Sequence, residues 1–447
     1  MPSVSLVPKF KEYAKVFYPL PDLPAFLHDQ PDFGCWTSPA HLPDNWAMKH
    51  FVRKLIIQER FKFLEDHAFS LRDKVPCHAV VSEVIAGGKH VVLELEFEDG
   101  VRWIARIMFP QCEQDDNHQC MGGYSEENFS DCIAGMESEI ATLQHVAKAT
   151  SVPVPRVFGY DLRKDNDIGG PYMLMEMIYG ETVAQWIKRK GGIHGSEVQL
   201  ILAQVADYLS QISRLRFKEL GRLRFNEDAK DSPRLEPYRS ETFPNSSSNA
   251  SEYVTNTIYS RLRRLGISEK DLNDPSEDWT RGNSMERKII AASIYLRTAR
   301  VLASRFTKGP FPLQHPDLNQ QNIIVDEEGN VRGILDWEDA KTVPFESYDV
   351  MARLLFKQWW QVWEGMEWTD EFAYLAFEKL ESDEVSKLSL IHKSPMGEIG
   401  RKLNPLTFLD FSGNVGELIR NLYEYFGDQA EQIVSKALAE EILGASM

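Results

Sequence analysis

The stretch 313–338 constrains the fold of this chain more than any other part of the sequence. A polar loop with Asp317 and Asn322 leads into the first of two short apolar runs, and the second run ends in Asp336. Two such runs joined by a glycine-containing turn predict an antiparallel hairpin. Because a hairpin brings its two ends together, we expect Asn322 and Asp336 to converge at its open end, with Asp317 nearby.

These three side chains suit the transfer of a phosphoryl group. Asn322 and Asp336 offer the hard oxygen ligands that Mg²⁺ prefers, and phosphates and waters usually complete the shell of that ion. Asp317 is then free to accept a proton from an attacking hydroxyl group. The order His-x-Asp-Leu-x-x-x-Asn followed by a metal-binding Asp is that of kinase catalytic loops. A chance polar loop before a hairpin is the alternative.

A β-meander is predicted for residues 80–108. Apolar and acidic side chains alternate through this stretch, which contains a Gly87-Gly88 bend and an Asp99-Gly100 turn. Such alternation around tight turns is typical of antiparallel strands with one buried face. Apolar spacing predicts further elements: an N-terminal helix within 46–73, a helix over 133–149, and strands at 157–160 and 172–175.

We therefore expect an α+β chain with a small β-rich N-terminal lobe and a large, mainly helical C-terminal lobe. The predicted boundaries are an N-terminal extension with a helix at 1–67, the small lobe at 68–178 and the large lobe at 179–447. The segment 228–256, rich in Ser, Pro and Asn, predicts a surface loop or lid in the large lobe.

The catalytic stretch resembles the aminoglycoside phosphotransferase and choline kinase-like family. The family hallmark is His-Gly-Asp-(Leu/x)-x-x-x-Asn followed by Ile-(Ile/Leu)-Asp-Trp-Glu. This chain has His315-Pro316-Asp317-Leu318, Asn322 and then Ile334-Leu335-Asp336-Trp337-Glu338, and it is similar to many uncharacterised fungal members. The resemblance covers most of 80–355. It implies a two-lobed protein kinase-like fold and the ATP- and Mg²⁺-dependent phosphorylation of a hydroxyl group on a small molecule.

The resemblance also assigns roles to individual residues. It implies that Asp317 is the catalytic residue, which orients and deprotonates the acceptor, and that Asn322 and Asp336 are metal ligands. Arg106 stands where the family usually has a phosphate-binding Lys, and Glu139 matches the helix glutamate that pairs with that cation. Arg binds phosphate bidentately but is not equivalent to Lys. A surface cation on an edge strand and a solvated glutamate are the alternatives.

Other positions match the nucleotide site of the family. Gly87 and Gly88 stand at its nucleotide-covering loop, where the lack of a side chain lets backbone N–H groups approach phosphates; an ordinary hairpin bend is the alternative. Glu176 and Met177 match the interlobe hinge, whose backbone binds adenine, although Met177 could equally fill the core. His315 matches a residue that braces the catalytic loop, or it is a simple buried histidine.

Composition limits the partners of the chain. A net charge of −17 disfavours general binding to nucleic acid. Since no apolar run approaches the roughly 18 residues of a membrane span and the start lacks a signal-peptide core, we expect a cytoplasmic protein without a membrane partner. Most of the acid excess lies after residue 311. It marks either a solvated helical surface or the mouth of a site for a cationic substrate.

Two other functions stay open. A nucleotide-binding pseudokinase or interaction module without turnover would fit Arg106 in place of Lys and the plain glycine bend. A protein kinase would require an Asp-Phe-Gly…Ala-Pro-Glu segment, and the residues after Asp336 do not contain one.

Overall fold

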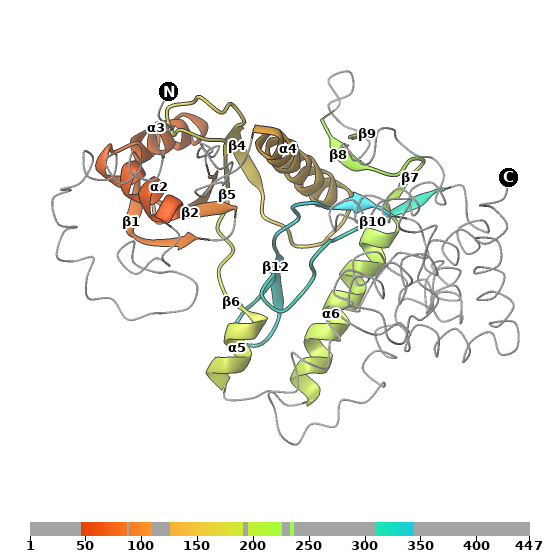
Figure 1. Cartoon of the computed structure of the whole chain (residues 1–447). Coiled ribbons are helices and arrows are strands. Elements are labelled where there is room, and N and C mark those ends of the chain that lie inside the picture. The colour runs from red at the N-terminus through yellow and green to blue at the C-terminus, as the bar shows by residue number, and fades with distance from the viewer. Residues whose placement is uncertain are drawn as a thin grey trace, which may run out of the picture.

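A five-stranded antiparallel sheet forms the first half of the fold (Figure 1). A computed structural model of the chain describes residues 46–86, 89–109, 126–190, 195–225, 233–236 and 309–343. The strand order is β1-β2-β3-β5-β4, and the strands are β1 (Cys77–Ala86), β2 (His90–Phe97), β3 (Arg102–Met108), β4 (Val157–Asp161) and β5 (Tyr172–Glu176). The predicted meander is confirmed, because β1 pairs with β2 and β2 with β3 in antiparallel register.

Helices cover both faces of this sheet. Side chains alternate between the faces of a strand, so Trp103, Ala105 and Ile107 of β3 point to one face, where they share a core with α2 (Trp46–Ile57) and α3 (Phe61–Leu71). Met173 and Met175 of β5 point to the other face and pack in a core with α4 (Glu126–Ala149). The helix predicted over 133–149 is confirmed, and it begins earlier than expected.

The single N-terminal helix predicted within 46–73 is instead two helices. The chain breaks between α2 and α3, where Glu59 has a positive φ of 48°. Leu55 and Leu64 are both buried against the sheet. They are nine positions apart, or about two and a half turns at 3.6 residues per turn, so one straight helix would place them on opposite sides. The break allows both helices to bury their apolar faces.

The second half of the described chain combines two helices with short strands. The helices are α5 (Val183–Lys190) and α6 (Gly195–Ser213). One three-stranded sheet has the order β12-β11-β6, and another has the order β13-β10-β7, while β8 pairs with β9. The strand bounds are β6 (Glu181–Thr182), β7 (Arg216–Phe217), β8 (Arg222–Arg224), β9 (Arg234–Glu236), β10 (Phe311–Gln314), β11 (Ile323–Val325), β12 (Val331–Ile334) and β13 (Lys341–Thr342).

These strands correct part of the prediction for the second half. One hairpin was expected after residue 193, and the described residues contain the β13-β10-β7 sheet and the β8–β9 hairpin as well. Strand β9 lies inside the predicted loop 228–256, where Arg234 and Glu236 pair with β8. Apart from 233–236, that loop lies outside the described residues, as do Gly87, Gly88 and everything after 343. The domain boundaries stay predictions.

A shared apolar core joins α4 to the predicted hairpin. Ile140 and Leu143 of α4 belong to the same buried cluster as Ile323 and Ile334 of the β11–β12 hairpin and as Trp337 beyond it. The helix that carries Glu139 and the hairpin that carries Asp336 are therefore held against a common core. Among the described helices, none combines the length and the hydropathy that a membrane crossing demands.

Candidate active site

The β11–β12 hairpin brings Asn322 and Asp336 to one end, as the sequence predicted. Ile323 pairs with Ile334 in antiparallel register. One step further out, the amide of Leu335 donates to the carbonyl oxygen of Asn322 at 2.8 Å. Asn322 therefore immediately precedes the first strand and Asp336 immediately follows the residue that closes the second.

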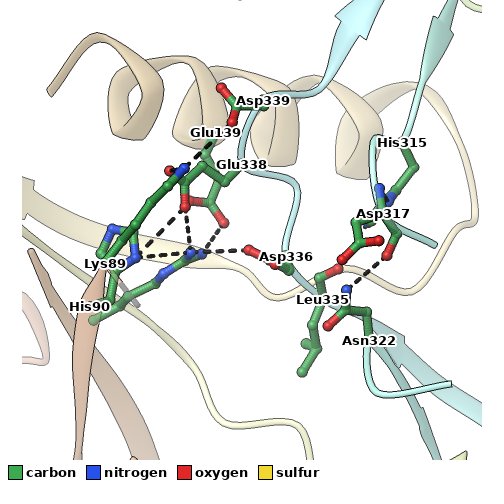
Figure 2. A network of polar contacts seen from close by, with 11 residues as sticks. Lys89, His90, Glu139, His315, Asp317, Asn322, Leu335, Asp336, Glu338 and Asp339 are labelled. Atoms are coloured by element: carbon green, nitrogen blue, oxygen red, sulfur yellow. Dashed lines mark hydrogen bonds and ion pairs between the residues drawn. The ribbon is translucent and has the colours of Figure 1, made fainter. Parts of the chain in front are cut away.

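The loop with Asp317 is tied to this end of the hairpin (Figure 2). The Nδ2 group of Asn322 donates to the carbonyl oxygen of Asp317 at 2.8 Å, and the amide of Asp317 donates to Nδ1 of His315 at 3.1 Å. Nε2 of His315 lies 2.9 Å from the carbonyl oxygen of Leu335. With Nδ1 as acceptor, Nε2 carries the proton and donates to that oxygen. The buried ring, edge-on to Trp337, thus links the loop to the hairpin.

Two hard oxygen donors remain for a cation. Because the amide nitrogen of Asn322 donates to the main chain, its Oδ1 is left as a ligand. Asp336 adopts a φ of 60°, which is uncommon for a residue with a Cβ atom and is often found at functional sites. One amide oxygen and one carboxylate fit Mg²⁺, which binds few protein ligands and takes phosphate oxygens and waters for the rest of its shell.

Arg106 connects the sheet to these residues. Its neighbours Ala105 and Ile107 face α2 and α3, so strand alternation turns Arg106 toward α4. Its Nη1 pairs with Glu139 of that helix, and its Nη2 lies 3.0 Å from Oδ1 of Asp336. The predicted pairing of Arg106 with Glu139 is present. The surface-cation and solvated-glutamate alternatives are wrong, because the two side chains are only 13% and 1% exposed.

Three carboxylates surround this one guanidinium, since Nη2 of Arg106 also lies 3.1 Å from Glu338. Burial lowers the pKa of Arg106, but Glu139, Asp336 and Glu338 outweigh it, so the pKa is raised and the group stays charged. Burial raises the pKa of Glu139 to about 8, and the attraction of Arg106 only partly offsets this. With Glu139 protonated, the two carboxylates Asp336 and Glu338 still outnumber the single guanidinium of Arg106.

Sequence reasoning missed Lys89 and Glu338, which Figure 2 shows beside this cluster. The Nζ of Lys89 lies 2.5 Å from Oε1 of Glu338 and 3.5 Å from Oδ2 of Asp339. The next residue, His90, lies 3.3 Å from Nη2 of Arg106 through its Nδ1. The sequence did hold a signal for both, since Lys89 directly follows Gly87-Gly88 and Glu338 ends the Asp-Trp-Glu string.

One backbone group of the predicted hinge is already engaged. The amide of Glu176 donates to the carbonyl oxygen of Arg156 at 2.8 Å, because the end of β5 continues its pairing with the chain before β4. That N–H group is not available to an adenine ring. Met177 follows β5 and is half-buried, and the contact of the hinge backbone with adenine stays a prediction. Gly87 and Gly88, the other predicted nucleotide contacts, lie outside the described residues.

Comparison with known proteins gives a family match over most of the chain. The profile of the phosphotransferase enzyme family (APH) matches residues 98–382. The altered inheritance of mitochondria protein 9, mitochondrial, of Saccharomyces cerevisiae is 26% identical over 265 residues, which are 59% of this chain and 34% of the relative. A subtelomeric hrmA-associated cluster protein of Aspergillus fumigatus is 33% identical over 154 residues, 33% of this chain and 25% of the relative. This chain thus matches about a third or less of each relative's length.

The solved structure of a kinase is also similar to this chain. An ethanolamine kinase of Plasmodium vivax aligns over 89% of this chain and 96% of its own, at 13% identity and a TM-score of 0.42.

Proposed function

Since this chain belongs to the phosphotransferase enzyme family, we propose that it transfers a phosphoryl group from ATP to a hydroxyl group of a small molecule, with Mg²⁺ as cofactor. The convergence of Asp317, Asn322 and Asp336 at the open end of one hairpin carries this proposal. Phosphoryl transfer requires little covalent chemistry from the protein, and its rate depends on positioning and on charge stabilisation. A rigid hairpin end that presents three oxygen-bearing side chains meets the first requirement.

Asp317 is the group placed to receive the proton of the acceptor hydroxyl. Its backbone is held on both sides, by the hydrogen bond from its amide to His315 and by the one that its carbonyl accepts from Asn322. A carboxylate on a main chain fixed in this way loses little freedom when it orients an acceptor. The acceptor hydroxyl would bind within hydrogen-bond reach of this carboxylate.

Asn322 and Asp336 would hold the metal ion, which supplies positive charge against the phosphate oxygens when bound. The charge of the site supports this assignment, because the carboxylates of Asp336 and Glu338 share Arg106 as their common cation. Arg106 fixes the direction of the Asp336 carboxylate through the contact at 3.0 Å. The backbone of Met177 would meet the adenine ring.

One observation favours a second candidate, a protein that binds nucleotide without turnover. The guanidinium of Arg106 is engaged by three carboxylates, so it is not free to bind phosphates as the Lys of related enzymes does. Turnover decides between the two candidates. Release of ADP with any hydroxylated metabolite from a broad panel supports the enzyme, whereas binding of Mg·ATP without turnover across the panel supports the second candidate.

The variant Asp317→Asn tests the catalytic assignment. It keeps the shape of the side chain and removes the proton acceptor, so we expect Mg·ATP affinity within about twofold of the wild type and a loss of turnover of about 100-fold or more, in the range of general-base catalysis. Asp165→Asn is the matched control, because Asp165 is an exposed carboxylate in the turn between β4 and β5. Wild-type turnover in Asp317→Asn would refute the role of Asp317.

A further inference from the structure

Lys89 links the start of β2 to the chain just beyond the β11–β12 hairpin. It lies directly before β2, yet its Nζ contacts Glu338, 249 positions later in the sequence. It also lies 3.5 Å from Asp339. Figure 2 shows Lys89 and Glu338 beside Asp336, on the side away from Asp317 and Asn322. This places a cation near the residues that would hold the metal ion and the phosphates.

Lys89 is freer to move than Arg106. The Arg106 side chain is 13% exposed and is engaged by Glu139, Asp336 and Glu338. The Lys89 side chain is 44% exposed. An ammonium group on a flexible four-carbon stem can be redirected without breaking a planar, bidentate contact. An ion pair whose lysine is partly exposed to solvent resists such a movement less than the buried contacts of Arg106 do.

The charge of Lys89 is secure at neutral pH. Partial burial by itself lowers the pKa of its ammonium group, but attraction to Glu338 and Asp339 outweighs the burial and leaves the pKa above the ordinary value for lysine. Glu338 does not depend on Lys89 alone, because its Oε2 contacts Arg106 at 3.1 Å. If Lys89 turns toward another anion, Glu338 therefore keeps a cationic partner.

We propose that Lys89 binds the phosphate groups of the nucleotide, and that Glu338 and Asp339 hold its ammonium group at the site before the nucleotide arrives. This inference rests on the proposed function. Lys89 supplies the mobile phosphate-binding cation that Arg106 cannot supply, because Arg106 is committed to carboxylates. In the sequence, Lys89 directly follows Gly87-Gly88, the pair that the family resemblance matches to the nucleotide-covering loop.

Equilibrium binding of Mg·ATP, Mg·ADP and adenosine, measured by calorimetry, tests the inference in the full chain. A hydrogen bond to a charged group contributes about 1.5–3 kcal/mol, which is a factor of about 10 to 100 in affinity. We expect Lys89→Met to weaken both magnesium nucleotides by about 10- to 100-fold and to leave adenosine within about twofold of the wild type. Lys89→Arg restores most of the affinity because it keeps the charge.

Lys164→Met is the matched control, since Lys164 is exposed in the turn between β4 and β5, and its affinities should equal those of the wild type. Lys89→Met that binds Mg·ATP as tightly as the wild type overturns the inference and leaves the proposed function standing. An equal loss of adenosine and Mg·ATP binding, together with a lower Tm of the nucleotide-free protein, also overturns it, because a purely structural ion pair would behave so. A wild-type chain that binds no Mg·ATP refutes the proposed function itself.

Discussion

Replacing Glu139 by Gln tests how the buried charges of the site are balanced. Glu139 is 1% exposed and contacts Arg106 through Oε1, while its Oε2 is buried without a hydrogen-bond partner among the described residues. Breaking one side of a buried ion pair costs about 3–5 kcal/mol when the other charge is left alone. Arg106, however, keeps Asp336 at 3.0 Å and Glu338 at 3.1 Å.

We therefore expect Glu139→Gln to lower the free energy of unfolding by only about 1–2 kcal/mol at about pH 5. This is the cost of a weaker hydrogen bond to Arg106 and of an amide donor placed where Oε2 has no partner. Arg106→Met removes the shared cation from Asp336 and from the largely buried Glu338, and it leaves the protonated Glu139 without its hydrogen-bond partner, so it should cost about 3–5 kcal/mol. The two partners of one ion pair thus differ in what their removal costs.

The pH dependence follows from the raised pKa of Glu139. The folded chain keeps this proton up to about pH 8, whereas an unperturbed carboxyl releases it near 4.5. The retained proton contributes its full stability below the unfolded-state pKa of 4.5. This stability is lost as the pH rises toward the folded-state pKa of about 8, by up to about 1.4 kcal/mol per pH unit. Gln does not titrate, so the advantage of the wild type over Glu139→Gln should shrink as the pH rises above about 5 and should reverse before about pH 8, because a loss of up to about 1.4 kcal/mol per unit over about three units exceeds it.

Urea unfolding followed by tryptophan fluorescence at these pH values measures the differences, provided that the slopes agree between variants. Equal losses for Glu139→Gln and Arg106→Met would refute the reasoning that Arg106 is held by several carboxylates. A difference between wild type and Glu139→Gln that does not change with pH would refute the raised pKa.

Two further sets of variants test the packing of Gly180 against Val325 and the role of His315. Gly180→Ala should lower the free energy of unfolding in urea by at least about 2 kcal/mol, because Gly180 has a φ of 143° and a Cβ would collide with the carbonyl oxygen of Val325. Gly100→Ala is the control, since Gly100 has a φ of 82° but lies in open space, and it should cost about 1 kcal/mol. Equal losses in the two variants would contradict the collision. His315→Ala should lower turnover about tenfold or more with Mg·ATP affinity within about twofold, because the ring holds the amide of Asp317. His315→Asn should recover part of the loss, and weakened nucleotide binding with unchanged turnover would contradict this role.

Local pattern was sufficient to predict the elements that depend on neighbours in the sequence. The alternation in β2 and β3 and the Asp99-Gly100 turn predicted the meander, and the spacing of apolar residues predicted α4. The predicted β11–β12 hairpin brings Asn322 next to Leu335, the residue before Asp336. Each follows from side-chain periodicity or turn chemistry within a few tens of residues.

The same periodicity failed where two elements had to reach one core. Apolar spacing alone predicted one helix over 46–73, and only the sheet beneath α2 and α3 requires the break at Glu59. The sequence also did not show that the amide of Glu176, in the predicted hinge, donates to the carbonyl oxygen of Arg156. That partner is chosen by the way β4 and β5 align, which no local pattern in either strand specifies.

The sequence by itself predicted which side chains would serve phosphoryl transfer, and it determined the strands and turns that carry Asn322 and Asp336. Only the tertiary structure decided that Arg106 is shared by three carboxylates and that Lys89 reaches Glu338. The physical reason is distance along the chain. Periodicity and turns are properties of adjacent residues, whereas a charge network is fixed by how the sheet, α4 and the hairpin pack on their common cores.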